Sequence, residues 1–101
     1  MAFKDTGRPR AGLVVSVLAS SLTNGWILAA PGENKQYVIL SIGTTSNGSL
    51  GTAADGATRV YYMRDGNITF PLGFSLGENK GLSTDVTGTN YISITYYIEK
   101  A

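Results

Sequence analysis

The alternation of apolar and polar positions is clearest in residues 91–98, close to the last residue of the chain. Isoleucine and tyrosine occupy the even positions of this run, and tyrosine, serine and threonine occupy the odd positions. Strict alternation of β-branched and aromatic side chains is typical of a β-strand with one dry face. We therefore expect this strand to belong to the core, and the chain to form one all-β unit.

Further strands are predicted between turn signals such as Asn24-Gly25 and Pro31-Gly32. Residues 43–58 are predicted to form a long loop, and Pro71 restricts its segment to a sheet edge or a strand end. No segment has the period of an amphipathic helix. About eight short strands at regular spacing predict an antiparallel β-sandwich or jelly roll. Besides 91–99, the expected strands are residues 12–20, 26–30, 36–42, 59–63, 68–70, 72–76 and 82–86.

The strands at residues 12–20 and 36–42 are apolar on both faces, which is typical of strands covered on both sides. Only 15% of the 101 residues are charged, whereas 43% are hydrophobic. A sandwich of this size buries a modest fraction of its surface and is marginally stable alone. We expect identical copies to cover part of the surface. The alternative is a monomer with a polar surface rich in serine and threonine.

Residues 1–11 differ from the rest of the chain because they contain three cations and one anion. Gly7 and Pro9 prevent regular structure there. We predict an extended N-terminal arm at 1–11, followed by a single β-sandwich domain at 12–101. Most chain ends are solvated tails, but Phe3 favours an arm that docks on a partner.

The chain contains no histidine and no cysteine, and its net charge is +1. These features exclude imidazole and thiolate chemistry and give no reason to expect nucleic-acid binding. The apolar run at residues 12–22 is rich in β-branched residues and too short to span a bilayer, so we predict neither a leader nor a membrane partner. We expect no enzymatic activity, no cofactor and no metal site.

Two patterns that suggest catalysis are better explained by turns and packing. Residues 73–77 match the Gly-x-Ser-x-Gly motif, but no helix follows Ser75 and no histidine exists to activate it. We expect the two glycines to mark close packing against another backbone. Four acids could meet in space, although no spacing requires it; they are Asp55, Asp65, Glu78 and Asp85.

Six tyrosines and Trp26 are the remaining candidates for a binding surface. In the neighbouring pairs 61–62 and 96–97 we expect the even member to point inward, which leaves Tyr61 and Tyr97 outside. Tyrosine is favoured where one end of the side chain is apolar and the other is wet. The expected subunit-interface residues are Tyr37, Tyr61, Phe74 and Tyr97. The alternative is that the aromatic rings stack on sugars.

Several stretches resemble a recurring pattern in small virion proteins of tailed phages. They are Gly25 to Ile42 with its Val-Ile-Leu-Ser run, the Phe-Pro-Leu piece at 70–72, the Glu-Asn-Lys-Gly-Leu piece at 78–82, and the closing tyrosine-rich strand. The resemblance covers residues 25–99 and points to the head decoration, or cement, proteins and related head fibres. It carries no catalytic motif.

The resemblance implies a trimeric knob on the outer surface of a capsid, which clamps neighbouring copies of the major capsid protein. Such proteins often bind through a terminal arm, a role that Phe3, Lys4, Arg8 and Arg10 could serve in this chain. The leading hypothesis is therefore a homotrimeric capsid decoration protein. The alternative is a carbohydrate-binding β-sandwich from a phage fibre or tail tip, suggested by aromatic residues beside the loop at 43–58.

Overall fold

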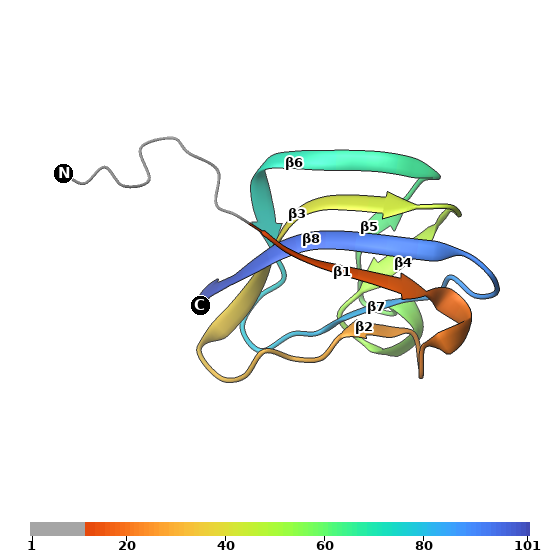
Figure 1. The fold of residues 1–101 in the computed structure, drawn as a ribbon. Helices are drawn as coiled ribbons and strands as arrows, with labels where there is room; N and C mark the ends of the chain where they lie inside the picture. Colours follow the sequence, from red (N-terminus) through yellow and green to blue (C-terminus); the bar gives the residue numbers. More distant parts are fainter. Residues whose placement is uncertain (1–11) are drawn as a thin grey trace.

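A computed structural model describes residues 12–101, which form eight antiparallel strands and two short 3-10 turns (Figure 1). No α-helix occurs in this part of the chain. The 3-10 turns are η1 (Ala19–Ser21) and η2 (Ala54–Gly56). The strands are β1 (Leu13–Leu18), β2 (Trp26–Leu28), β3 (Lys35–Thr44), β4 (Gly48–Gly51), β5 (Arg59–Met63), β6 (Gly66–Ser75), β7 (Leu82–Thr84) and β8 (Tyr91–Lys100).

The strands form two four-stranded sheets with the orders β1-β8-β3-β6 and β2-β7-β4-β5. The first strand pairs with the last, the second with the seventh, the third with the sixth, and the fourth with the fifth. The chain is therefore one long antiparallel ribbon that is rolled so that its two arms alternate between the sheets. This nesting defines a jelly roll, and it confirms the fold class expected from the sequence.

The C-terminal strand β8 lies between β1 and β3, in the middle of its sheet. Its Ile94 is opposite Val15 of β1 and Ile42 of β3. Ile92 and Ile94 are completely buried, so the even face of the strand is the dry one, as the alternation predicts. Ile98 is 42% exposed because it lies near the free end of β8.

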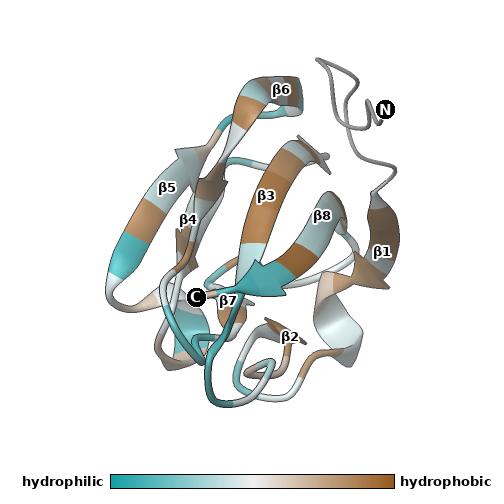
Figure 2. Cartoon of the chain, turned by 90° about the vertical axis from the view of Figure 1, so that its left-hand side faces the viewer, coloured by the Kyte–Doolittle hydropathy of each residue, from teal (hydrophilic) through white to brown (hydrophobic). Residues whose placement is uncertain are grey.

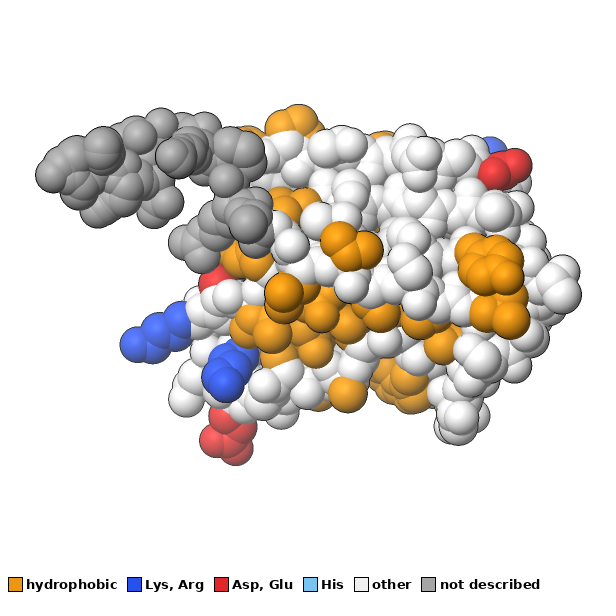
Figure 3. Space-filling model, viewed as in Figure 1, with side chains coloured by type: hydrophobic (Ala, Val, Ile, Leu, Met, Phe, Trp, Pro, Cys, Tyr) orange, Lys and Arg blue, Asp and Glu red, His pale blue; other side chains and the backbone are white. Residues whose placement is uncertain are grey.

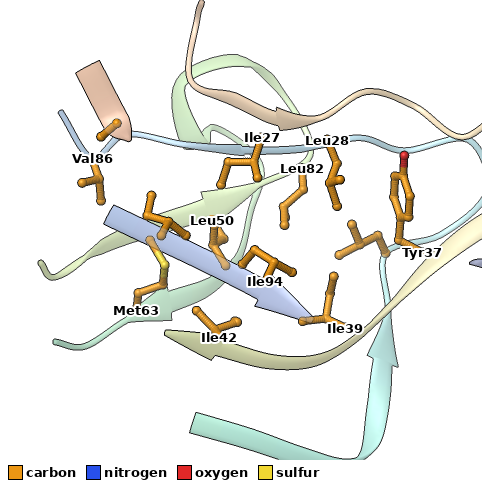
Figure 4. Packing of buried hydrophobic residues seen from close by; sticks show 13 residues of the cluster. Ile27, Leu28, Tyr37, Ile39, Ile42, Leu50, Met63, Leu82, Val86 and Ile94 are labelled. Atoms are coloured by element: carbon orange, nitrogen blue, oxygen red, sulfur yellow. The ribbon is translucent and has the colours of Figure 1, made fainter. Parts of the chain in front are cut away.

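The hydrophobic core fills the space between the two sheets (Figure 4). Ile39 and Ile42 of β3 face Leu50 of β4, Met63 of β5 and Leu82 of β7, and all five side chains are almost completely buried. Burial of one such side chain contributes roughly 1.5–3 kcal/mol to the free energy of unfolding. The core is thus made by both sheets together, and neither sheet is stable without the other.

The structure differs from the predicted strands at two places. Strand β4, Gly48–Gly51, lies inside the segment that was expected to be a loop. Its own residues are poor strand formers. It is extended because it pairs with both β5 and β7, and all four of its residues are buried. Residues 68–70 and 72–76 were expected to be separate strands, but β6 covers most of both.

Strand β6 is an edge strand, as Pro71 required. Thr69 pairs with Ser41 and Phe74 with Ile39, so four residues of β6 bulge out opposite one residue of β3. Gly73 lies in this bulge with a φ of +73°, and a Cβ there would lie 2.5 Å from the Val38 side chain. The close packing expected of both glycines is confirmed for Gly73, whose added Cβ would also lie 3.3 Å from the Ile39 carbonyl oxygen, and is wrong for Gly77, where the nearest atom would be Lys80 Cγ at 3.7 Å. The strand ends at Ser75 without a following helix.

A buried serine holds the loop between β4 and β5. Ser83 of β7 is completely buried, and its Oγ accepts a hydrogen bond of 2.9 Å from the N–H of Gly56. Its hydroxyl proton can be donated to the carbonyl oxygens of Gly51 or Ala53. A single hydroxyl therefore satisfies backbone groups of the loop that would otherwise be buried without partners.

Replacing Ser83 by alanine should lower the free energy of unfolding by roughly 1–3 kcal/mol, because the Gly56 N–H loses its partner. The matched control is Ser20→Ala at an exposed position, where a change within about 0.5 kcal/mol is expected. Urea unfolding followed by circular dichroism measures both variants. Equal stability of the two variants would show that Ser83 does not hold the loop.

The buried Tyr37 gives the protein a pH-dependent stability. Its hydroxyl donates to the carbonyl oxygen of Ala29, and its ring packs edge-on against Tyr96 at 5.3 Å. Burial, and secondarily the charge of an ionised Tyr96, raise the pKa of Tyr37 above its ordinary value of 10.0. Between that value and the folded-state pKa, the unfolded chain releases the phenolic proton and the folded chain retains it.

The contribution of Tyr37 to stability should therefore be constant below about pH 10 and should fall as the pH rises further. The variant Tyr37→Phe should lose this part of the alkaline decline, because it has no phenolic proton. Urea midpoints measured between about pH 9 and pH 11 compare the two proteins. Identical pH profiles for both would contradict the assigned role of Tyr37.

Candidate functional site

One continuous segment of the described chain carries no charged residue. Residues 12–32, which include β1, η1 and β2, contain no lysine, arginine, aspartate or glutamate. Strand β1 ends one sheet and β2 ends the other, and both lie on the same side of the molecule (Figures 1 and 2). Apolar side chains form a belt across the face of the molecule that Figure 3 shows. We call residues 12–32 the uncharged edge.

Strand β1 is the exposed border of the uncharged edge. Val14, on the outer face, is 65% exposed, and Leu13, at the start of the strand, is 55% exposed. The strand pairs with β8 in one unbroken register, and the described residues provide no strand partner on its other side. It thus presents both apolar side chains and unpaired backbone groups to the surroundings.

The other three edge strands in the described part of the chain have features that disfavour pairing with a second copy of the chain. Strand β6 has its bulge and Pro71, and β5 has Arg59 and an irregular register. Strand β2 has only three residues and a shifted register. Charges, proline, bulges and shortness are the usual means by which proteins protect sheet edges. Strand β1 has none of them, so we consider it the candidate assembly surface.

The aromatic residues expected at a subunit interface lie mainly inside the protomer. Tyr37 is only 6% exposed and belongs to the core, so the interface role expected for it is wrong. Tyr61 and Phe74 pack with Phe70, with ring centroids 4.8–6.2 Å apart. This aromatic cluster lies between β5 and β6, on the side opposite the uncharged edge.

The expected orientations hold for one tyrosine pair and fail for the other. Tyr96 points inward toward Tyr37, and Tyr97 pairs with Val38 on the outer face and is half-buried. In β5, however, Tyr61 packs inward and Tyr62 is 43% exposed. The hydrophobic pattern of β5 is too short to fix its register. The prediction that Tyr62 points inward and Tyr61 outward is therefore wrong.

The predicted docking residues Phe3, Lys4, Arg8 and Arg10 lie outside the described residues. Their role in binding a capsid therefore stays a prediction. The described chain begins at Gly12, where a Cβ would approach the side chains of Thr95 and Leu40 on the outer face of the sheet.

Two of the four acids that could have met in space instead accept hydrogen bonds from the backbone of neighbouring segments. An Asp85 carboxylate oxygen accepts a 2.8 Å hydrogen bond from the N–H of Ser49, and Glu78 accepts one of 2.9 Å from the N–H of Asn34. Within residues 12–101, no group of three or more acidic residues is arranged to hold a metal ion. No helix of the described chain is long and apolar enough to cross a membrane.

A cationic cluster on β5 was not anticipated from the sequence. The guanidinium carbons of Arg59 and Arg64 lie 5.5 Å and 5.4 Å from the ring centroid of Tyr62. Strict alternation would place Arg59 on the face of Tyr61, away from Tyr62 and Arg64. A register irregularity opposite Leu50 and Gly51 shifts it to their side. Sequence reasoning had no signal for that irregularity.

Comparisons with protein-family models, with curated proteins and with solved structures find no match to this chain.

A charge introduced on β1 should prevent self-association. We expect Val14→Lys to weaken association of the full chain at least tenfold, because the variant buries an ammonium group in an apolar contact. Val14 is already 65% exposed, so the fold should be unaffected. Sedimentation velocity over a range of concentrations measures the effect.

The matched control is Thr69→Lys, which adds the same charge to an exposed position on β6, at the other end of the same sheet. This variant should associate like the original protein. If Val14→Lys associates equally well, β1 is not the assembly surface.

Proposed function

We propose that this protein is a structural virion protein, a capsid decoration subunit that associates with its own copies and binds the major capsid protein on the outer surface of the capsid. The observation that carries the proposal is the unprotected β1 strand within an edge that has no charge. Such an edge is suited to permanent contact with other subunits and poorly suited to isolation in water.

The jelly-roll topology is compatible with this role. Jelly rolls occur in viral capsid proteins and also in lectins and cupins, so the fold alone does not choose among them. The additional support is the absence of imidazole and thiol groups from the chain and the use of acidic side chains in turns. A decoration protein needs a rigid body and complementary surfaces, and it needs no reacting group.

A closed trimer requires each protomer to contribute two different patches, because a three-fold contact is heterologous. The uncharged edge offers two patches, on strands that are consecutive in the sequence and end different sheets. One is β1 with Leu13 and Val14, and the other is the β2 region with Trp26, which is 36% exposed. We propose that β1 of one copy packs against the β2 region of the next copy.

The second candidate function is glycan binding, which the fold also permits. Its requirement is a platform of exposed aromatic rings. The most exposed rings in the described chain are Trp26, Tyr62 and Tyr91, on β2, β5 and β8. They do not form a common cluster, and Tyr62 is already in contact with two guanidinium groups. The uncharged edge therefore supports assembly better than the rings support sugar binding.

Light scattering coupled to size exclusion tests the proposed self-association. The full chain should elute with the mass of three copies at high micromolar concentration, and a stable 10.7 kDa monomer would exclude the decoration trimer. Deletion of residues 2–10 should leave the trimer intact and strongly reduce binding to purified capsids, as measured by co-sedimentation. Unchanged capsid binding would remove the arm from the proposal, and binding to a glycan array without capsid binding would favour the second candidate.

A further inference from the structure

The cationic cluster on β5 is the most distinctive surface that the proposed function leaves unused. Strand β5 ends its sheet on the side opposite the uncharged edge (Figures 1 and 2). Residues 12–101 contain five cations, and two of them lie on the same tyrosine ring. The contacts of these two arginines are with Tyr62 and Ser49, and neither guanidinium pairs with an acidic group of the described residues.

The cluster is held in place before any ligand arrives. Arg59 Nη1 donates a long hydrogen bond of 3.4 Å to the Oγ of Ser49. Each guanidinium also has a cation–π contact with Tyr62, worth roughly 0.5–1 kcal/mol at an exposed site. Side chains that are already ordered lose less entropy when they bind. The arrangement thus favours recognition over simple solubility.

The backbone that leads into the cluster is strained. Thr58, directly before Arg59, has a φ of +54°, which is unfavourable for a β-branched residue. The loop retains this conformation through hydrogen bonds from the N–H of Thr52 to Thr58 and from the N–H of Ala53 to Ala57. The Oγ of Ser83 holds the same loop by accepting a hydrogen bond from the N–H of Gly56. Strain that the surrounding structure maintains is often found at functional positions.

We propose that β5 binds an extended acidic segment of another protein, which adds to the sheet as a further antiparallel strand. The outer edge of β5 has no strand partner among the described residues, so its backbone groups are free to pair. Carboxylates of the added strand would pair with Arg59 and Arg64, and an apolar side chain between them would cover Tyr62. Opposite charges on facing strand positions stabilise such pairing.

The spacing of the cluster defines the sequence that it would recognise. Alternate residues of a strand lie on the same face, about 6.6–6.8 Å apart. A segment with the order acid, any residue, apolar, any residue, acid would place its three recognised side chains along the cluster. The chain itself has no two acidic residues four positions apart, so it does not contain this motif.

A second copy of the chain is a poor occupant of this strand. Pairing of β5 with another β5 would bring four guanidinium groups onto the same sheet face, and like charges on facing strands are destabilising. The partner is therefore a different, acidic polypeptide. The inference stands on β5 alone and does not depend on the proposed capsid role.

The test uses the full chain labelled with 15N and a synthetic peptide with the core Asp-Thr-Val-Thr-Asp. Its control peptide has asparagine in place of both aspartates. We expect the acidic peptide to shift the backbone amide resonances of β5 and of Arg64, and the neutral peptide to bind at least tenfold more weakly. The variant R59Q/R64Q should lose at least tenfold in affinity for the acidic peptide.

The matched control is K35Q/K100Q, which removes the same charge from two exposed lysines that face each other on β3 and β8. It should bind the acidic peptide like the original protein. If R59Q/R64Q has a lowered unfolding midpoint, R64Q alone, outside the strand, serves in its place.

Three results would overturn the proposal. The first is the absence of acidic-peptide binding at millimolar concentration, or resonance shifts elsewhere than β5. The second is an equal loss of affinity in R59Q/R64Q and K35Q/K100Q, which would indicate unspecific charge attraction. The third is tighter binding of a heparin-derived hexasaccharide than of the peptide at the same β5 residues, which would assign the cluster to an acidic glycan.

Discussion

The insertion of β8 between β1 and β3 is the contact on which the rest of the structure depends. Its Ile92 and Ile94 are completely buried, and they join residues from opposite ends of the chain into one sheet. The sheet cannot close before the last strand is present. Pairing between such distant segments makes folding slow compared with that of proteins of local topology. It also makes the C-terminal strand indispensable, although it lies beside the chain end.

This arrangement fixes which strands are left at the borders. A jelly roll of eight strands ends in four edges, here β1 and β2 on one side and β5 and β6 on the other. The two sides differ in chemistry. Residues 12–32 carry no charge, whereas β5 and the turn after it carry two arginines on one tyrosine. We propose that the first side contacts copies of the same chain and that the second binds an acidic partner.

The parts of the protein that resemble catalytic features have structural roles. Asp85 and Glu78 accept hydrogen bonds from backbone groups of neighbouring segments, and Ser83 is buried beneath a loop. Gly73 permits a close contact with Val38. The Gly-x-Ser-x-Gly match around Ser75 therefore reflects packing and not a nucleophile turn. The described surface therefore offers recognition chemistry, made of exposed strand edges, apolar side chains and guanidinium groups.

Local periodicity determined much of the fold. The alternation in residues 91–98 and the apolar runs at 12–20 and 36–42 identified β8, β1 and β3, and Pro71 restricted its segment to a sheet edge or a strand end. These features can be predicted from sequence because successive side chains of a strand point to opposite faces of the sheet. Proline, in addition, has no N–H to donate a hydrogen bond inside a sheet. The absence of histidine and cysteine is likewise evident from the sequence without a structure.

Tertiary contacts determined the conformation of β4 and the orientation of side chains in β5, which the local sequence pattern does not predict. Strand β4 is extended because β5 and β7 pair with it from both sides, although its sequence is Gly-Ser-Leu-Gly. The register irregularity in β5 brought Arg59 to Tyr62 and Arg64, whereas Tyr61 is on the inner face because it pairs in regular register with the buried Leu50. A shift of one residue exchanges the two faces of a strand, and only the neighbouring strand determines where that shift occurs.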